Sequence, residues 1–155
     1  MCVSMPADRA RRLSKHFVLG DVLVDSTFPE LAGGLDPPPS HLANLERLGV
    51  LLDAVADQFP PGFEVVSGYR DQALNDACIQ AGLPASVRSL HLTGCAADVR
   101  PKNDETDLEV VYEWLRGRAL ALALHEAVFY PRKGFIHVAV FDPEQPTPSR
   151  ILMRI

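Results

Sequence analysis

Hydrophobic and polar positions alternate along the chain with two periods, which predict helices and strands in turn. After residue 40, apolar side chains recur every three or four positions, the spacing of one helix face: Leu42, Leu45, Leu48, Leu52, Val55 and Phe59. Ser40 is the expected cap of this helix. The segment 63–67, rich in β-branched residues, follows as a short strand.

The same alternation continues to residue 140. Asp71 is the expected cap of a second helix that ends before Gly82, and 94–99 is a strand of small residues. Thr106 and Glu109 form a capping-box pattern that opens a third helix, weakened at Gly117. Two strands joined by the turn at 131–134 complete the pattern as a hairpin.

The segments outside this series are short and rich in turn residues. We expect an edge element at 18–28, a connector at 33–40 and a peripheral, proline-interrupted tail at 141–155. The whole predicts an α+β fold with a mainly antiparallel central sheet flanked by helices. The 155 residues suit a single domain, 1–155, with its core at roughly 13–140.

Composition and charge exclude several classes of function. Apolar residues make up 47% of the chain and charged residues 23%, as in an ordinary globular protein. The net charge of −5 provides no polycationic surface for nucleic acid, and no apolar run is long enough for a membrane span. Without a secretory signal pattern at the start, we expect synthesis in the cytoplasm as a monomer, with Cys78 and Cys95 unpaired.

Strand geometry points to a candidate metal site. In a strand at 94–99, Asp98 shares its face with Gly94 and Ala96, which leave room beside the carboxylate, while Cys95 points to the other face. His91 precedes this strand, and His137 lies on the less buried face of the last one. Two histidines and an acid from neighbouring strands are a familiar zinc set with one open position. The alternative is two structural histidines and an aspartate bonded to a turn.

Three segments resemble one known family. The stretch "SLHLTGCAAD" at 89–98 fits S-x-H-x-x-G-x-A-x-D, the signature of the zinc D-alanyl-D-alanine carboxypeptidases and murein endopeptidases, whose fold the Hedgehog signalling domain shares. The stretch "VSGYRDQALN" at 66–75 resembles the family's S-G-Y-R segment. The stretch "YPRKGFIHVAV" at 130–140 resembles its closing strand. The resemblance covers most of 13–140 and implies the Hedgehog/DD-peptidase fold.

The resemblance also implies roles for individual residues. The zinc ligands would be His91, Asp98 and His137. Arg70 would bind a carboxylate or carbonyl of the peptide stem, a task that suits a planar donor, or else would form an exposed ion pair. Ser89 would support the ligand turn or touch the substrate.

Three positions depart from the family pattern. Relatives hold an acid three residues before the last ligand, a histidine two residues before it, or an acid two residues after it. Here Gly134, Phe135 and Ala139 stand at these positions. A general base is then expected from His125 or Glu126, at the start of the preceding strand. Alternation turns only one of them toward the site and does not choose between them.

The predicted function follows from the resemblance. It is a zinc-dependent peptidase that cleaves peptidoglycan stem peptides or cross-links, with these peptides as its partner and Zn²⁺ as its cofactor. Because no export signal is evident, action at the cell wall would follow lysis, phage release or non-classical export. The alternative is a zinc-binding module of the same fold, weakly active or inactive, that binds cell wall or belongs to a virion.

Overall fold

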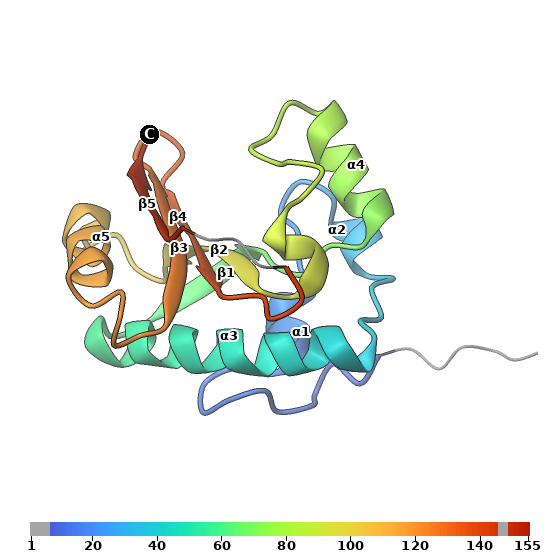
Figure 1. The fold of residues 1–155 in the computed structure, drawn as a ribbon, viewed down its shortest axis with the longest axis horizontal. Coiled ribbons are helices and arrows are strands. Elements are labelled where there is room, and N and C mark those ends of the chain that lie inside the picture. The colour runs from blue at the N-terminus through green and yellow to red at the C-terminus, as the bar shows by residue number, and fades with distance from the viewer. Residues whose placement is uncertain (1–6, 146–148) are drawn as a thin grey trace, which may run out of the picture.

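The computed structural model describes residues 7–145 and 149–155 and has one five-stranded sheet with helices around it (Figure 1). The strands are β1 (Phe63–Ser67), β2 (Ala96–Pro101), β3 (Leu124–Tyr130), β4 (Phe135–Val140) and β5 (Ile151–Arg154). They lie in the order β1-β2-β4-β3-β5, and every pair is antiparallel except β3 with β5. The predicted α+β class and mainly antiparallel sheet are confirmed, and β5 makes the sheet mixed.

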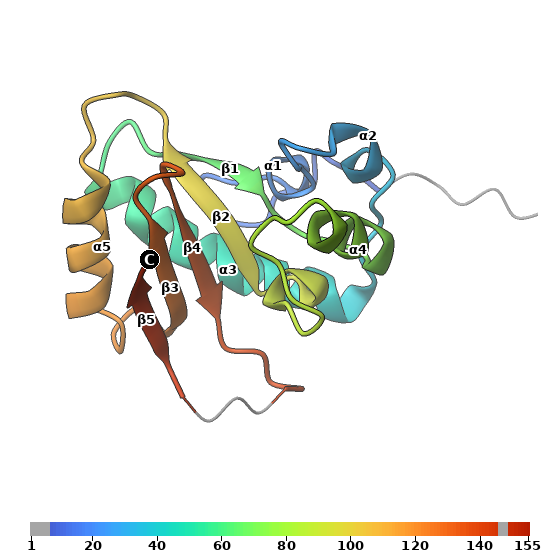
Figure 2. The same ribbon diagram turned by 90° about the horizontal axis from the view of Figure 1, so that it is seen from above.

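Five α-helices and one 3₁₀ helix are described in this part of the chain. They are α1 (Leu19–Val22), α2 (Pro29–Ala32), α3 (Pro39–Gln58), α4 (Gln72–Gln80), η1 (Leu90–Thr93) and α5 (Leu108–Gly117). Figure 2 shows the long α3 crossing behind the strands, with α5 at the left of the view and α4 at the right. None of the described helices has the length and apolar character that crossing a membrane requires.

One face of the sheet is packed against α3 and α5. Alternate residues of β4 point into this core, where Ile136, Val138 and Val140 are all at most 4% exposed. Tyr112 of α5 stacks on Phe129 of β3, with ring centroids 5.8 Å apart. Phe59, which directly follows α3, meets Trp114 of α5 edge-on. Burial of this apolar face is the main source of stability for the fold.

The other face carries the polar residues of the same strands. Asp98 of β2 lies directly across from His137 of β4, and Glu126 of β3 pairs with Ala139, which shares the face of His137. No helix packs flat on this side in Figure 2; η1 and the segment after α4 lie beside it. The candidate site therefore lies on the face that the long helices leave open.

Four local expectations differ from the structure. The segment 18–28 contains the short helix α1, because the Asp21 carboxylate accepts the N–H of Val18 at 2.8 Å, and only one bridge, Asp25 to Ser67, reaches the sheet. Helix α3 begins at Pro39 and not after a Ser40 cap, since the fixed φ of proline suits the first helical position.

The other two differences lie later in the chain. Asp107, and not Thr106, caps α5 by accepting the N–H of Glu109 at 2.9 Å; the Thr106 hydroxyl donates to Asn103. The tail, expected at the periphery, contains a strand that the sequence did not predict: residues 151–154 are largely exposed and pair with β3 at the parallel edge of the sheet. The cap of α4 is as expected: Asp71 accepts the N–H of Leu74 at 2.9 Å.

Candidate metal centre

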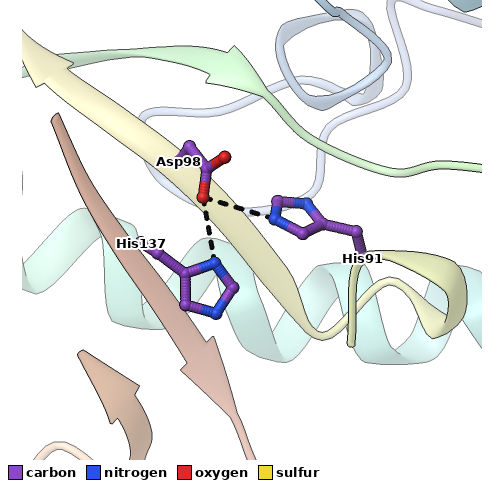
Figure 3. Close-up of side chains that lie close together, drawn as sticks. All are labelled: His91, Asp98 and His137. Atoms are coloured by element: carbon purple, nitrogen blue, oxygen red, sulfur yellow. Dashed lines mark hydrogen bonds and ion pairs between the residues drawn. The ribbon is translucent and has the colours of Figure 1, made fainter. Parts of the chain in front are cut away.

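The three predicted ligands come together from three elements. His91 lies on η1, Asp98 on β2 and His137 on β4, and one ligand atom of each lies within 4.8 Å of the others. Asp98 Oδ1 is 2.9 Å from His137 Nδ1 and 3.3 Å from His91 Nε2. Figure 3 shows both imidazole rings directed at this one oxygen. The group is therefore compact enough to hold a single metal ion.

Local backbone geometry places His91. Ser89 caps η1 by accepting the N–H of His91 at 3.2 Å, so the serine supports the ligand turn, one of its two predicted roles. Gly94 ends η1 with φ +82°, and a Cβ there would lie 2.7 Å from the carbonyl oxygen of His41. The glycine and serine of the 89–98 motif are therefore required by the ligand turn itself.

Hydrogen bonding fixes which nitrogen of His91 faces Asp98. Its Nδ1 lies 2.7 Å from the carbonyl oxygen of Gly68, which can only accept, so Nδ1 carries the proton. Burial lowers the pKa of His91 and favours the neutral ring. The unprotonated Nε2 and the Asp98 carboxylate are then two acceptors that face each other. A cation between them satisfies both.

Two carboxylates hold His137. Its Nδ1 is 2.9 Å from Asp98 and its Nε2 is 2.9 Å from Glu126 Oε1. Burial alone would lower the pKa of His137, but the hydrogen bonds to Asp98 and Glu126 outweigh it and raise the pKa to about 9. When Nε2–H donates to Glu126, Nδ1 is the nitrogen left for a metal ion, and such carboxylate–histidine pairs orient metal ligands.

The acids of the site stay ionised at neutral pH. Burial opposes this at Asp98, yet the nearby His91 and His137 bring its pKa well below the usual range. The pKa of Glu126 is lowered in the same way, burial being outweighed by its hydrogen bond to His137. Two imidazole nitrogens and one carboxylate oxygen suit several divalent first-row metal ions, zinc among them.

Arg70 lies beside the metal group and is buried. Only 3% of it is exposed, and its Nη2 is 3.8 Å from Asp98 Oδ2. Its Nε and Nη2 donate to Ser67 Oγ at 3.2 and 3.0 Å, and its Nη1 donates to Asn75 Oδ1 at 3.3 Å. The exposed ion pair offered as an alternative is therefore wrong. Arg70 is a fixed cation that neutralises Asp98 and lines a cavity next to it.

Of the two candidate bases, the structure turns Glu126 toward the metal group. His125 lies where the register between β3 and β4 shifts, and its ring meets Phe141 edge-on at 5.3 Å. The three family positions without an ionisable group lie close by. Gly134 is exposed in the β3–β4 turn, and Phe135 packs against Tyr130 with centroids 4.8 Å apart. Ala139, on β4, is fully buried.

Both described cysteines are free thiols away from the metal ligands. The Sγ of Cys95 is 3.9 Å from Arg47 of α3, on the helix-covered side of β2, as the strand pattern predicts. The Sγ of Cys78 is 3.9 Å from Asp25 Oδ2. Burial raises the pKa of both thiols, so neither is a reactive thiolate. Cys2 lies outside the described residues.

Sequence reasoning gave no role to the residues that hold Arg70. Ser67 and Asn75 stand at the two ends of the "SGYRDQALN" segment, so their spacing from Arg70 was a usable signal. For Asp25 the sequence has no such signal, because Asp25 accepts the Ser67 hydroxyl at 3.0 Å although the two residues are 42 positions apart. A polar chain thus runs from Asp25 through Ser67 and Arg70 to Asp98.

Two cavities open beside the metal group. The β3-side cavity, of about 270 Å³, is lined by His91, His137, Glu126, Tyr130, Arg88 and residues 84–86, 89 and 90. The β1-side cavity, of about 220 Å³, is lined by Asp98, Arg70, Arg100, Lys133, Phe135 and parts of 25–27, 66–67, 83–84 and 134. Pro84, in the segment after α4, touches both. A ligand at the metal group can therefore extend to either side.

Known proteins provide no further guide. No protein-family model, no curated protein and no solved structure matches the chain.

Proposed function

We propose that this protein is a zinc-dependent peptidase that cleaves peptide bonds in peptidoglycan stem peptides or cross-links. The observation that carries the proposal is the group of His91, Asp98 and His137, whose ligand atoms lie within 4.8 Å of one another on the open face of the sheet. The stretch at 89–98, which fits the signature of zinc D-alanyl-D-alanine peptidases, supplies the substrate class.

Each ligand residue has a second polar atom beside a neighbour: His91 Nδ1 at the Gly68 carbonyl, His137 Nε2 at Glu126 and Asp98 Oδ2 at Arg70. His91 Nε2, Asp98 Oδ1 and His137 Nδ1 would hold the ion. When bound, zinc would polarise the scissile carbonyl and make a water molecule a nucleophile near neutral pH. Arg70 limits the negative charge at Asp98, because its Nη2 lies 3.8 Å from Asp98 Oδ2. The site is thus organised by its surroundings before any substrate arrives.

Glu126 is the proposed proton acceptor. It is ionised, partly exposed and lines the β3-side cavity together with the two histidine ligands. Its Oε1 holds His137 Nε2, on the side of the ring away from Nδ1, so it would receive the proton of the attacking water through one water in the β3-side cavity and return it to the leaving amine in the same way. Such a role fills the function of the acid missing at Gly134 and Ala139. His125, which meets Phe141 at the register shift, is the less suitable candidate.

A second candidate is a zinc-binding module that binds cell wall without cleaving it. The observation that favours it is the absence of an ionisable group at Gly134, Phe135 and Ala139. The hydrogen bond from His137 to Glu126 is compatible with both candidates, because an orienting carboxylate is useful in either. Only a test of cleavage separates them.

The test uses purified peptidoglycan fragments of defined stem length, incubated with the zinc-loaded protein and analysed by mass spectrometry. We expect products that show addition of one water at a single peptide bond. The variant His137→Ala should lose both zinc and cleavage. His16→Ala is the matched control, because the His16 imidazole is exposed and pairs with Asp57, which is not part of the metal group. Bound zinc without cleavage of any fragment would favour the module, and absence of bound metal would contradict both candidates.

A further inference from the structure

Strand β5 has an open outer edge. It is the last strand in the order β1-β2-β4-β3-β5, and Figure 2 shows it outermost of the five. The N–H of Ile155 donates to the carbonyl oxygen of Phe129 at 2.9 Å, so every second residue here directs its backbone groups at β3. The backbone groups of Leu152 and Arg154 then point away from the sheet, and no hydrogen bond from the described part of the chain reaches them. This edge can therefore accept another strand.

One face of β5 is apolar and exposed. Ile151, Met153 and Ile155 are 39%, 48% and 64% exposed, and alternation places them on the same face. Ile151 pairs in register with Glu126, so this is the open face of the sheet, which carries the metal group. Three neighbouring apolar side chains form a stripe, unlike the single exposed apolar residues of most surfaces. The stripe and the open edge belong to one short segment.

The charged residues of this segment are engaged within the chain. The Arg154 guanidinium lies on the opposite face, 5.8 Å from the centre of the Phe129 ring, and its Nη2 is 3.0 Å from Glu109 Oε2. Arg150, just before the strand, donates its Nε–H to the carbonyl oxygen of Leu124 at 2.6 Å. Free charged side chains commonly protect edge strands from pairing, and these two arginines are held elsewhere.

An antiparallel second copy of β5 is complementary to this edge in one register. With Met153 on the two-fold axis, Leu152 of each copy forms a hydrogen-bonded pair with Arg154 of the other. On the open face, Ile151 then lies across from Ile155 of the second copy, and the two Met153 side chains lie across from each other. Each apolar side chain of the stripe therefore meets an apolar partner, which stabilises paired strands.

Charge disfavours the neighbouring registers. With Leu152 on the axis, Arg154 of each copy would lie across from Arg150 of the other. With Arg154 on the axis, the two copies of this arginine would face each other. Like charges directly across a strand pair are destabilising. The register centred on Met153 avoids both conflicts and also pairs the whole of 151–155.

We propose that β5 pairs antiparallel with β5 of a second copy, so that the chain forms a symmetric dimer in place of the monomer expected from its sequence. The two sheets join into one, with both metal groups on the same side and about 24 Å apart over five strand spacings. Such an arrangement suits a polymeric substrate that reaches both groups. This consequence rests on the proposed function, whereas the dimer itself does not.

The experiment measures association of the full-length protein by sedimentation equilibrium. A chelator is present, so that a dimer bridged by metal is not counted. Because the contact is one short strand, the interface is small, and we expect a reversible dimer with a dissociation constant in the micromolar range or weaker. Met153→Glu places two like charges across the axis and should weaken association about tenfold or more. Val50→Glu is the matched control, because Val50 is 65% exposed on α3, which packs on the other face of the sheet.

Cross-linking tests the register. In a Cys2→Ser background, Met153→Cys places two thiols in a non-hydrogen-bonded pair whose Cα atoms lie about 4.5 Å apart, within reach of a disulfide. Ile151→Cys places them about 13 Å apart along the strands. Cys78 and Cys95 are buried and should not react. We expect a covalent dimer through position 153 and not through position 151 in a glutathione redox buffer.

Each outcome supports or overturns the dimer. Monomers alone at concentrations up to about 1 mM would overturn it, since any affinity would then be weaker than that of a specific complex. Association that Met153→Glu leaves unchanged, or faster cross-linking through Ile151→Cys, would overturn it as well. A dimer with the expected variants, together with no cleavage by the zinc-loaded protein, would support the pairing and contradict the peptidase alone.

Discussion

The two faces of the sheet are built from alternate residues of the same strands: one face packs the core, and the other carries the metal group. On β4, Ile136 and Val138 are buried against α3 and α5, whereas His137 between them faces the open side and meets Asp98 and Glu126. The apolar face contains few hydrogen-bonding side chains, and the open face has a connected polar network around the metal group. A shift of one residue in strand register would exchange the two sets.

The comparison shows how stability and chemistry are separated over a distance of one residue. The helix-covered face tolerates only apolar side chains, because an unpaired polar group there would be costly. The open face can hold two histidines and two acids because each is hydrogen-bonded to another or to the backbone. Substitutions on the two faces should therefore alter different properties.

The largest effect is expected from Glu126→Gln on the open face. General-base assistance is worth about 10²–10⁴-fold in rate, so cleavage at saturating zinc should fall by a factor in that range. The amide oxygen can still accept the Nε2–H of His137, so zinc affinity should change by less than the 10–100-fold typical of losing an outer contact. Cleavage rates and a chelator competition titration measure the two effects. An equally large drop in His125→Ala, with none in Glu126→Gln, would reverse our assignment of the base.

On the covered face, Ile136→Ala should destabilise the fold and leave the metal group intact. Removing this fully buried side chain leaves a cavity and should cost about 2–5 kcal/mol of unfolding free energy. Urea denaturation in chelator gives that quantity, and zinc affinity should equal that of the wild type under folding conditions. If zinc affinity fell while stability did not, the two faces would not be separable in this way.

A smaller effect is expected from pH on the metal-free protein. The folded pKa of His137 is about 9, above its unfolded value of 6.5, so its contribution to stability is complete below pH 6.5 and is lost as pH rises through 9. Between pH 6.5 and about 8.5, the unfolding free energy should fall by about 2 kcal/mol. Thermal or urea unfolding in chelator tests this, with His137→Ala as the control that should lack the slope. A wild-type stability that stays flat or rises over this range would contradict the two hydrogen bonds assigned to His137.

The sequence predicted the elements more reliably than it predicted their ends and pairings. The spacing of three to four residues predicted the long helix, and strand alternation correctly predicted that His137 lies on the less buried face of the last strand. The pairing of 151–154 with β3 could not be read from the chain, because a short strand after prolines has no local signal of its partner. The Ser40 cap was wrong because proline at the first helical position competes with it.

The metal group was predictable because the pattern of its own strand or turn marks each ligand, although Asp98 and His137 stand 39 residues apart. Strand alternation places Asp98 and His137 on one face, and the turn at 89–94 places His91. The hydrogen-bond network that holds Arg70 was not predictable, because Asp25 reaches Ser67 only through the folded arrangement of α1, β1 and the segment between them. The choice of Glu126 over His125 likewise required the register shift in β3, which no pattern in the sequence announces.

The most direct test of the central claim is an anomalous diffraction measurement at the zinc edge on crystals grown with zinc. We expect one peak on the open face, about 2.0–2.2 Å from His91 Nε2, Asp98 Oδ1 and His137 Nδ1, with a fourth position open toward the two cavities. A peak bound by other residues, or none at this group in zinc-saturated crystals, would contradict the account.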